Sequence, residues 1–164
     1  MKTSIVTLLI TFCFYLSVYA QAPQDKATEL KEQALSSLKQ KDYIKARYLF
    51  KKAYEAFAVR ENYPQAIECG IQANALYVRE NFYKEGFELC RNMEQLIWTG
   101  EQKQNKVFYD LRFPISKERL QMYISLKNPA QAKNQLDKLE EIASLAKNDS
   151  LMEARWKEIF NFAH

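Results

Sequence analysis

The sequence has few of the residues on which most nucleotide-binding and metal-dependent sites rely. Its 164 residues include three glycines, which lie at least fourteen residues apart. Glycine-rich phosphate loops need two or three glycines within about six residues, so these motifs are excluded. The only histidine is the final residue, His164. A histidine-dependent nucleophile or a histidine-based zinc site is therefore not expected, and we predict no catalytic residue, cofactor or metal.

Proline is almost as scarce, with four residues in the whole chain. Folds made mainly of β-strands use glycine and proline in their many turns, so this composition argues against them. The chain is 48% apolar and 27% charged, which suits one globular unit. Composition alone thus favours a single helical domain.

The N-terminal segment is typical of a secretory signal peptide. Lys2 precedes an uncharged apolar stretch, residues 5–19, and Ala20 supplies the small residue expected before a cleavage site. Cleavage there would leave Gln21 as the first residue. The stretch is short for a membrane span, which needs about 20 apolar residues, but an uncleaved anchor is the alternative. We therefore expect residues 1–20 to direct export, and the protein to be periplasmic or secreted.

The charges of the remaining chain do not indicate a nucleic-acid partner. Without Lys2 the chain keeps 23 Lys and Arg against 20 Asp and Glu, an excess of three positive charges. These charges alternate in sign along the chain, whereas nucleic-acid binders concentrate cations in a patch. We expect no nucleic-acid binding, and a membrane contact only through the signal segment or a further C-terminal part.

After residue 21 the sequence predicts helices throughout. Apolar residues recur every three or four positions, as in Ala27, Leu30, Ala34 and Leu38, which places them on one buried helical stripe. Pro114 should kink or interrupt the helix that contains it. Polar residues mark the expected breaks at Lys41-Asp42, Asn62, Asn81, Thr99-Gly100, Asn128-Pro129 and Asn148-Asp149-Ser150. Connections this short favour antiparallel hairpins.

These hairpins form a repeat. The second helices of three pairs begin at Asp42, Phe82 and Asn128, each with a small residue at its fifth position. Equivalent positions are 40 and then 46 residues apart. Helix pairs repeated at such intervals are typical of an α-solenoid. We therefore predict an all-α solenoid over residues 21–164, with pairs at about 25–60, 63–98 and 103–146 and the start of a fourth unit at 149–164.

In the first pair, the second helix begins with Asp42-Tyr43-x-Lys45-Ala46. This pattern resembles the start of the second helix in the tetratricopeptide-repeat family. The family's first-helix aromatic matches Tyr77 and Tyr123, and its first-helix small residue matches Ala34. The resemblance covers about residues 25–146, although the spacing exceeds the family's usual period of about 34 residues. It implies a protein or peptide partner bound along the concave surface of the first helices.

Carried onto this sequence, that surface combines apolar and basic groups, which suits a peptide with hydrophobic anchors and some negative charge. Its residues are Lys31, Leu35, Leu38, Lys39, Ile71, Ala75, Val78, Arg79, Lys117, Gln121 and Ile124. The alternative is that the apolar members pack against the neighbouring unit. The family's clamp for a terminal carboxylate needs Asn beside Lys, and the matching positions hold Leu35, Ala75 and Gln121, so this clamp is not expected.

Two cysteines remain after the signal segment, Cys69 and Cys90, and they should lie at the same level of the second hairpin. Export permits a disulfide between them. Free cysteine is also among the residue types that are most often buried, so both the disulfide and the free thiols remain possible.

The function that these features favour is a non-catalytic interaction module. An export segment followed by tetratricopeptide-like units resembles the periplasmic sensor segment of Bacteroidetes-type membrane signalling proteins. That resemblance implies a longer protein that continues beyond His164 to a membrane helix and a histidine kinase or transcriptional regulator. The alternatives are a small stand-alone secreted scaffold, or an enzyme that uses carboxylates such as Glu68, Glu88 or Glu94.

Overall fold

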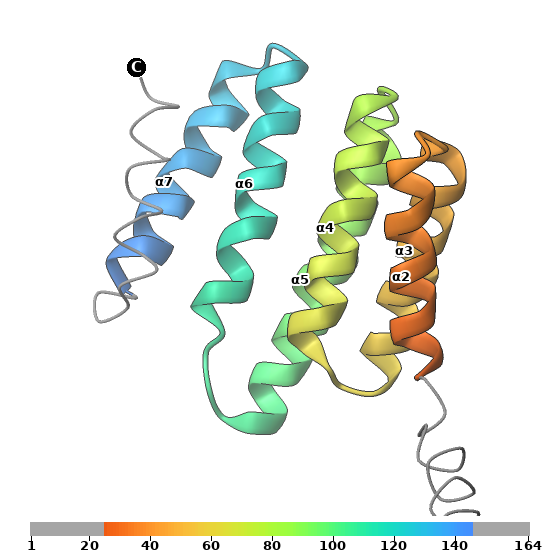
Figure 1. The fold of residues 1–164 in the computed structure, drawn as a ribbon. Helices are drawn as coiled ribbons and strands as arrows, with labels where there is room; N and C mark the ends of the chain where they lie inside the picture. Colours follow the sequence, from red (N-terminus) through yellow and green to blue (C-terminus); the bar gives the residue numbers. More distant parts are fainter. Residues whose placement is uncertain (1–24, 146–164) are drawn as a thin grey trace, which may run out of the picture.

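The computed structural model describes residues 25–145, and this part of the chain contains six α-helices and no β-strand. The helices are α2 (Lys26–Lys39), α3 (Tyr43–Val59), α4 (Tyr63–Arg79), α5 (Tyr83–Gln104), α6 (Tyr109–Ser125) and α7 (Pro129–Leu145) (Figure 1). The predicted all-α class is confirmed. No helix in this part is both long and apolar enough to span a membrane. The predicted signal segment, its cleavage site after Ala20 and the predicted helix at 149–164 lie outside the described residues.

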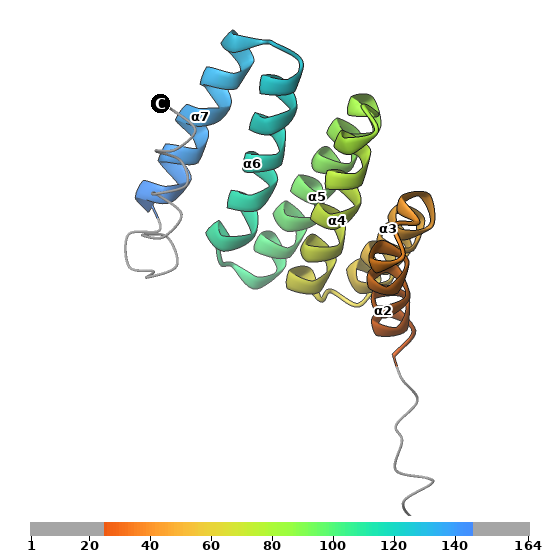
Figure 2. The ribbon, with the colours of Figure 1, turned by 45° about the horizontal axis from the view of Figure 1, so that its top comes forward.

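Each helix packs against the next one in sequence, and α4 also contacts α6. Figures 1 and 2 show the hairpins α2–α3, α4–α5 and α6–α7 side by side, with their internal turns at one end. Fully buried Phe50, Ile67, Met93 and Met122 belong to the main core, which runs from α2 to α6. A smaller cluster between α6 and α7 contains Phe113, Leu120, Leu139 and Ala143. The apolar stripes read from the sequence therefore face the neighbouring helices.

The same three-residue turn connects consecutive helices at four places. Its central residue has a positive φ: 62° at Lys41, 58° at Glu61, 62° at Asn81 and 53° at Lys127. Around Lys41, the Lys41 N–H donates to the Leu38 carbonyl at 3.0 Å, and the following N–H donates to the carbonyl five residues back. This is the Schellman pattern, and equivalent bonds surround the other three turns. Four of the predicted breaks are thus confirmed.

The helices that follow three of these turns begin with a side-chain cap. The Oδ1 atoms of Asp42, Asn62 and Asn128 each accept from the backbone N–H three residues later. Such caps satisfy donors that have no partner within the helix. Pro129 takes the first helical position after Asn128, as predicted, where its missing N–H costs nothing.

The predicted break at Thr99-Gly100 is wrong, because α5 continues to Gln104 and the second pair extends beyond residue 98. Gly100 serves a close approach between helices. A Cβ atom placed there would lie 2.7 Å from Cζ of the buried Tyr63 ring on α4. The glycine is therefore explained by tertiary packing, which sequence reading mistook for a helix end.

Pro114 lies inside α6 and does not interrupt it, so of the two predicted outcomes, a kink or a break, the break is wrong. Proline removes one helical hydrogen bond, but Phe113 and Ile115 beside it are both buried and hold the helix in place. The irregular segment comes earlier, at residues 105–108, where Asn105 has a φ of 48°. The third pair accordingly begins at Tyr109 instead of residue 103.

Gly100→Ala tests the close approach to Tyr63. Overpacking costs about 1–3 kcal/mol, and the better helix propensity of alanine returns about 1 kcal/mol. We expect a net loss of up to about 2 kcal/mol in the free energy of unfolding, measured by urea denaturation. Gln102→Ala, at an exposed site on the same helix, is the control and should not destabilise. A more stable Gly100→Ala variant would contradict the packing role.

Lys41→Gly tests the turn. A left-handed backbone costs a non-glycine residue about 1–2 kcal/mol, and glycine avoids this cost. Part of the gain is offset because glycine has more conformational freedom to lose from the unfolded chain. We expect the free energy of unfolding to rise by about 0.5–1 kcal/mol. Lys41→Ala removes the same charge without relieving the backbone, and it should give no gain. Equal stabilities of the two variants would refute this explanation.

Candidate functional site

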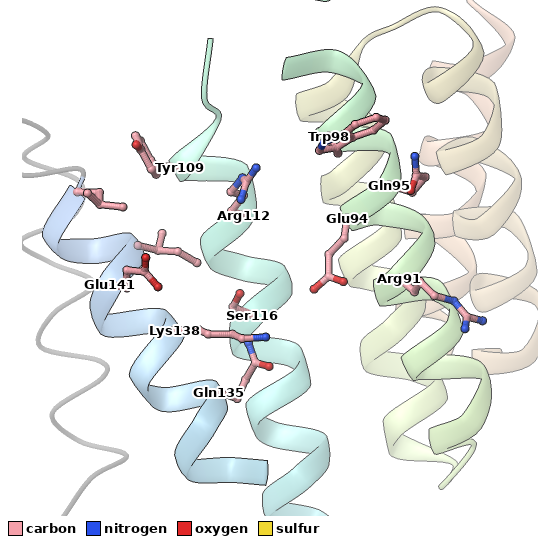
Figure 3. Close-up of a pocket in the computed structure, with 12 residues that line it drawn as sticks. Arg91, Glu94, Gln95, Trp98, Tyr109, Arg112, Ser116, Gln135, Lys138 and Glu141 are labelled. Carbon is pink, nitrogen blue, oxygen red and sulfur yellow. The ribbon is translucent and has the colours of Figure 1, made fainter. Parts of the chain in front are cut away.

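A groove of about 550 Å³ lies between α5 and α7, with α6 as its floor (Figure 3). Its lining residues are Arg91, Glu94, Gln95, Trp98, Tyr109, Arg112, Ser116, Gln135, Lys138, Glu141, Ile142 and Leu145. Both wall helices pack against α6. The groove is the space left between them above it, and its volume is in the usual range for ligand sites.

At one end of the groove, an ion pair connects α5 to α6. Glu101 is 6% exposed, and its Oε1 accepts from Arg112 Nε at 2.7 Å and from the Phe108 N–H at 2.8 Å. A second guanidinium nitrogen of Arg112, Nη2, pairs with Glu101 Oε2. We call this arrangement the Glu101 clasp. Its bidentate geometry fixes the guanidinium plane of Arg112 at the groove.

The Glu101 clasp also determines the charge of its carboxylate. Burial by itself would raise the pKa of Glu101, but the hydrogen bonds from Arg112 and from the Phe108 N–H outweigh it, and the pKa is lowered. Glu101 is therefore ionised at neutral pH. Arg112 remains half-exposed, and its Nη1 atom takes no part in the clasp.

The same end of the groove is lined by aromatic and aliphatic groups. Trp98 is 54% exposed and Leu145 is 58% exposed, while Tyr109 and Ile142 are half-buried. Figure 3 shows Trp98, Arg112 and Tyr109 at one level of the groove. Exposed tryptophans in grooves are common anchor points for protein partners, since they bury a large apolar surface and still offer an N–H donor.

Charged side chains enter the groove farther along. Glu94 on α5 and Lys138 on α7 point into it from opposite walls (Figure 3). Glu94 already pairs with Arg119 at 2.8 Å. Lys138, by contrast, makes no ion pair with another described residue. Arg91, the third cation of the lining, extends away from the groove in Figure 3. The groove therefore presents Lys138 and the outer edge of Arg112 as its available cations.

The surface predicted from the first helices lies elsewhere, and none of its residues lines this groove. Leu35, Lys39, Ala75, Arg79, Gln121 and Ile124 are exposed, whereas Lys31, Leu38, Ile71, Val78 and Lys117 are half-buried. Leu38, Ile71 and Val78 pack against the core, which is the alternative that the sequence left open for apolar members.

Two basic members of that surface are engaged within the fold. Lys31 donates to Gln65 at 2.9 Å and pairs with Glu68 at 2.7 Å, which connects α2 to α4. The guanidinium of Arg79 lies 4.0 Å from the centre of the Tyr43 ring on α3. These contacts leave fewer groups on the first helices for a partner. Whether a partner binds there stays a prediction.

The structure holds Cys69 and Cys90 as free, buried thiols, which is one of the two states that the sequence left open. Cys69 belongs to α4 and Cys90 to α5, and both are fully buried. Burial raises the pKa of Cys69 to about 11 and that of Cys90 to about 12. Both are thus poor nucleophiles at neutral pH.

The carboxylates named as enzyme candidates are on the surface. Glu88 is exposed, and Glu68 and Glu94 are engaged by Lys31 and Arg119. The buried carboxyl of Glu101 and the half-buried carboxyl of Glu118 were not identified from the sequence.

Glu118 lies apart from the groove and accepts from Asn74 Nδ2 at 2.8 Å. Burial raises its pKa. In residues 25–145 no group of three or more His, Cys, Asp or Glu side chains is placed to hold a metal.

The groove was not predicted from the sequence, because the predicted binding surface was placed on the first helices. The walls of the groove come from α5 and α7, which are the second helices of their pairs. The best available clue was Trp98, which follows Ile97 and falls outside the buried stripe of Leu89, Met93 and Ile97. No protein-family model, curated protein or solved structure matches the chain. Function must therefore be inferred from the chemistry of the groove and of the helical surface.

Glu101→Gln tests the Glu101 clasp. Near pH 7 we expect the free energy of unfolding to fall by about 1–3 kcal/mol, because a charged hydrogen-bonded pair is lost. The lowered pKa makes this contribution full above the ordinary pKa of glutamate and lost as the pH falls through the lowered value. The difference between the variant and the wild type should therefore shrink as the pH falls from 7 into the acid range. Urea denaturation near pH 7 and in acid measures it.

The control for the clasp is Glu55→Gln, which removes an exposed carboxylate paired with Lys52 at 3.0 Å. Exposed pairs of this kind contribute about 0–1 kcal/mol. If the two variants lose equal stability, the clasp is no stronger than a surface pair.

Glu118→Gln should have the opposite effect. The raised pKa means that burying the ionised carboxylate costs stability above that pKa, and the cost disappears as the pH falls through it. The amide oxygen of Gln can still accept from Asn74. We expect the variant to be more stable than the wild type near pH 7, with a difference that vanishes in acid. A destabilised variant would mean that the carboxylate is stabilised by its charge.

Proposed function

We propose that the chain is an exported, non-catalytic interaction module that binds a protein or peptide segment, and that its helices form a tetratricopeptide-like α-solenoid. The repeated turn at Lys41, Asn81 and Lys127 supports the repeat, since these positions are the 40- and 46-residue steps of the sequence pattern. The row of hairpins in Figures 1 and 2 is consistent with it. Arrays of this kind present extended surfaces for binding.

The observation that carries the binding role is the groove of α5, α6 and α7. It combines an exposed tryptophan with a guanidinium held in a fixed orientation. An aromatic anchor beside a preorganised charge suits recognition, because little side-chain freedom is lost when a partner binds. Its carboxylates, Glu94 and Glu141, are exposed, which fits binding better than acid–base catalysis in a secluded pocket.

The wider setting that we propose rests on the sequence. The apolar stretch at residues 5–19 supports export, and the helical repeat after it supports a sensing part of a longer membrane signalling protein. In that setting the module would receive a protein or peptide signal outside the cytoplasm. A stand-alone secreted scaffold is the other setting, and the same groove would serve it.

Selection from a display library of random peptides tests the binding role, with the exported protein immobilised. We expect enriched peptides that bind the wild type, and Trp98→Ala should weaken their binding about tenfold as an anchor residue would. Tyr48→Ala, which removes a 60% exposed aromatic on α3, is the matched control and should leave binding unchanged. Leu35→Glu and Ile124→Glu test the first-helix surface in parallel. Failure to enrich any peptide would contradict the proposed function.

A further inference from the structure

We infer that the groove of α5, α6 and α7 recognises an acidic protein segment, with a carboxylate of the segment at Arg112 and Lys138 and an adjacent bulky apolar side chain against Trp98. This inference rests on the proposed function and specifies the chemistry of the partner.

The bulky apolar side chain of the partner is inferred from the end of the groove near Leu145. Trp98 and Leu145 together leave large apolar surfaces open to solvent, while Ile142 and Tyr109 next to them are only half-buried. Burial of such surfaces is the main favourable contribution to association. The groove holds a few side chains and not a folded domain, because its volume is about 550 Å³. A short segment with one or two bulky apolar residues fits this space.

The acidic character of the partner is inferred from the positive charges in the groove that are not fully paired within the fold. Glu101 fixes Arg112 through Nε and Nη2, so the guanidinium can offer Nη1 without further loss of conformational freedom. Lys138 points into the groove from the α7 wall and has no ion-pair partner among the described residues. A carboxylate between them would gain two charge-assisted hydrogen bonds.

The negative charges of the groove do not cancel this preference. Glu94 points inward, but Arg119 already pairs with it at 2.8 Å. Glu141 is exposed on α7, one turn from Lys138 and away from Arg112 in Figure 3. The available charge at the centre of the groove is therefore positive, and charge complementarity favours an acidic partner over a basic one.

Three defined peptides test the inference. Each has twelve residues, an acetylated N-terminus and an amidated C-terminus, so that no terminal charge contributes. The first places glutamates on both sides of a Phe-Leu pair, the second replaces those glutamates by lysines, and the third replaces the Phe-Leu pair by serines. Because the chain has two tryptophans, Trp156→Phe makes Trp98 the only one, and its fluorescence reports occupancy of the groove.

We expect the acidic apolar peptide to change the Trp98 emission and to bind at least about tenfold more tightly than either of the other peptides. Lys138→Glu should weaken the binding of the acidic peptide about tenfold and improve that of the lysine peptide. Lys133→Glu makes the same charge change at an exposed site on α7 outside the groove, and it should affect neither by more than about twofold. Lys138→Gln provides a second variant without charge reversal, and thermal unfolding verifies that each variant is folded.

The inference is overturned if the lysine peptide binds as tightly as the acidic one, or if Lys138→Glu and Lys138→Gln leave the binding of the acidic peptide unchanged. It is also overturned if none of the three peptides binds. In each case the display selection still judges the proposed function separately, because peptides of another chemistry can be enriched there.

Discussion

The buried carboxylate of Glu101 is the interaction on which the C-terminal half of the described structure depends. Four of the five connections between the described helices use one tight turn, and the connection from α5 to α6 does not. There Glu101 accepts the Phe108 N–H at the start of α6 and holds Arg112 one turn later. One side chain thereby determines where α6 begins and how it lies against α5. The groove exists because α6 is held there and α7 packs against its other side.

A comparison of Glu101 with the half-buried Glu118 shows why this interaction is effective. Burying a charge is costly unless an opposite charge and hydrogen bonds compensate for the lost water. Glu101 has both, and its pKa is lowered although burial opposes this. Glu118 is half-buried, and it accepts a hydrogen bond from the neutral amide of Asn74, but burial still raises its pKa. The first carboxyl stabilises the fold in its ionised form, and the second one resists ionisation.

The same physical distinction separates the two candidate binding surfaces. On the first helices, Lys31 and Arg79 are used to join neighbouring helices, through an ion pair and a contact with an aromatic ring. In the groove, Arg112 also joins two helices, but its Nη1 atom takes no part in the Glu101 clasp. Lys138 makes no ion pair within the described residues. A cation that is held in place and only partly satisfied is better suited to a partner than one whose partners are all internal. For this reason the groove carries the functional proposal.

The sequence by itself determined the helices, because apolar spacing, side-chain caps such as Asp42 and Asn128, and short polar breaks act over a few residues. It also indicated the repeat, since equivalent turns recur along the chain. It could not distinguish a glycine that ends a helix from one that admits the Tyr63 ring, nor foresee that helix α6 continues through Pro114, because both outcomes depend on residues far away in the sequence. The groove, the free state of Cys69 and Cys90, and the pairing of Glu101 with Arg112 were decided only by the tertiary structure. Each of them requires knowing which faces of separate helices meet, and local periodicity does not specify that.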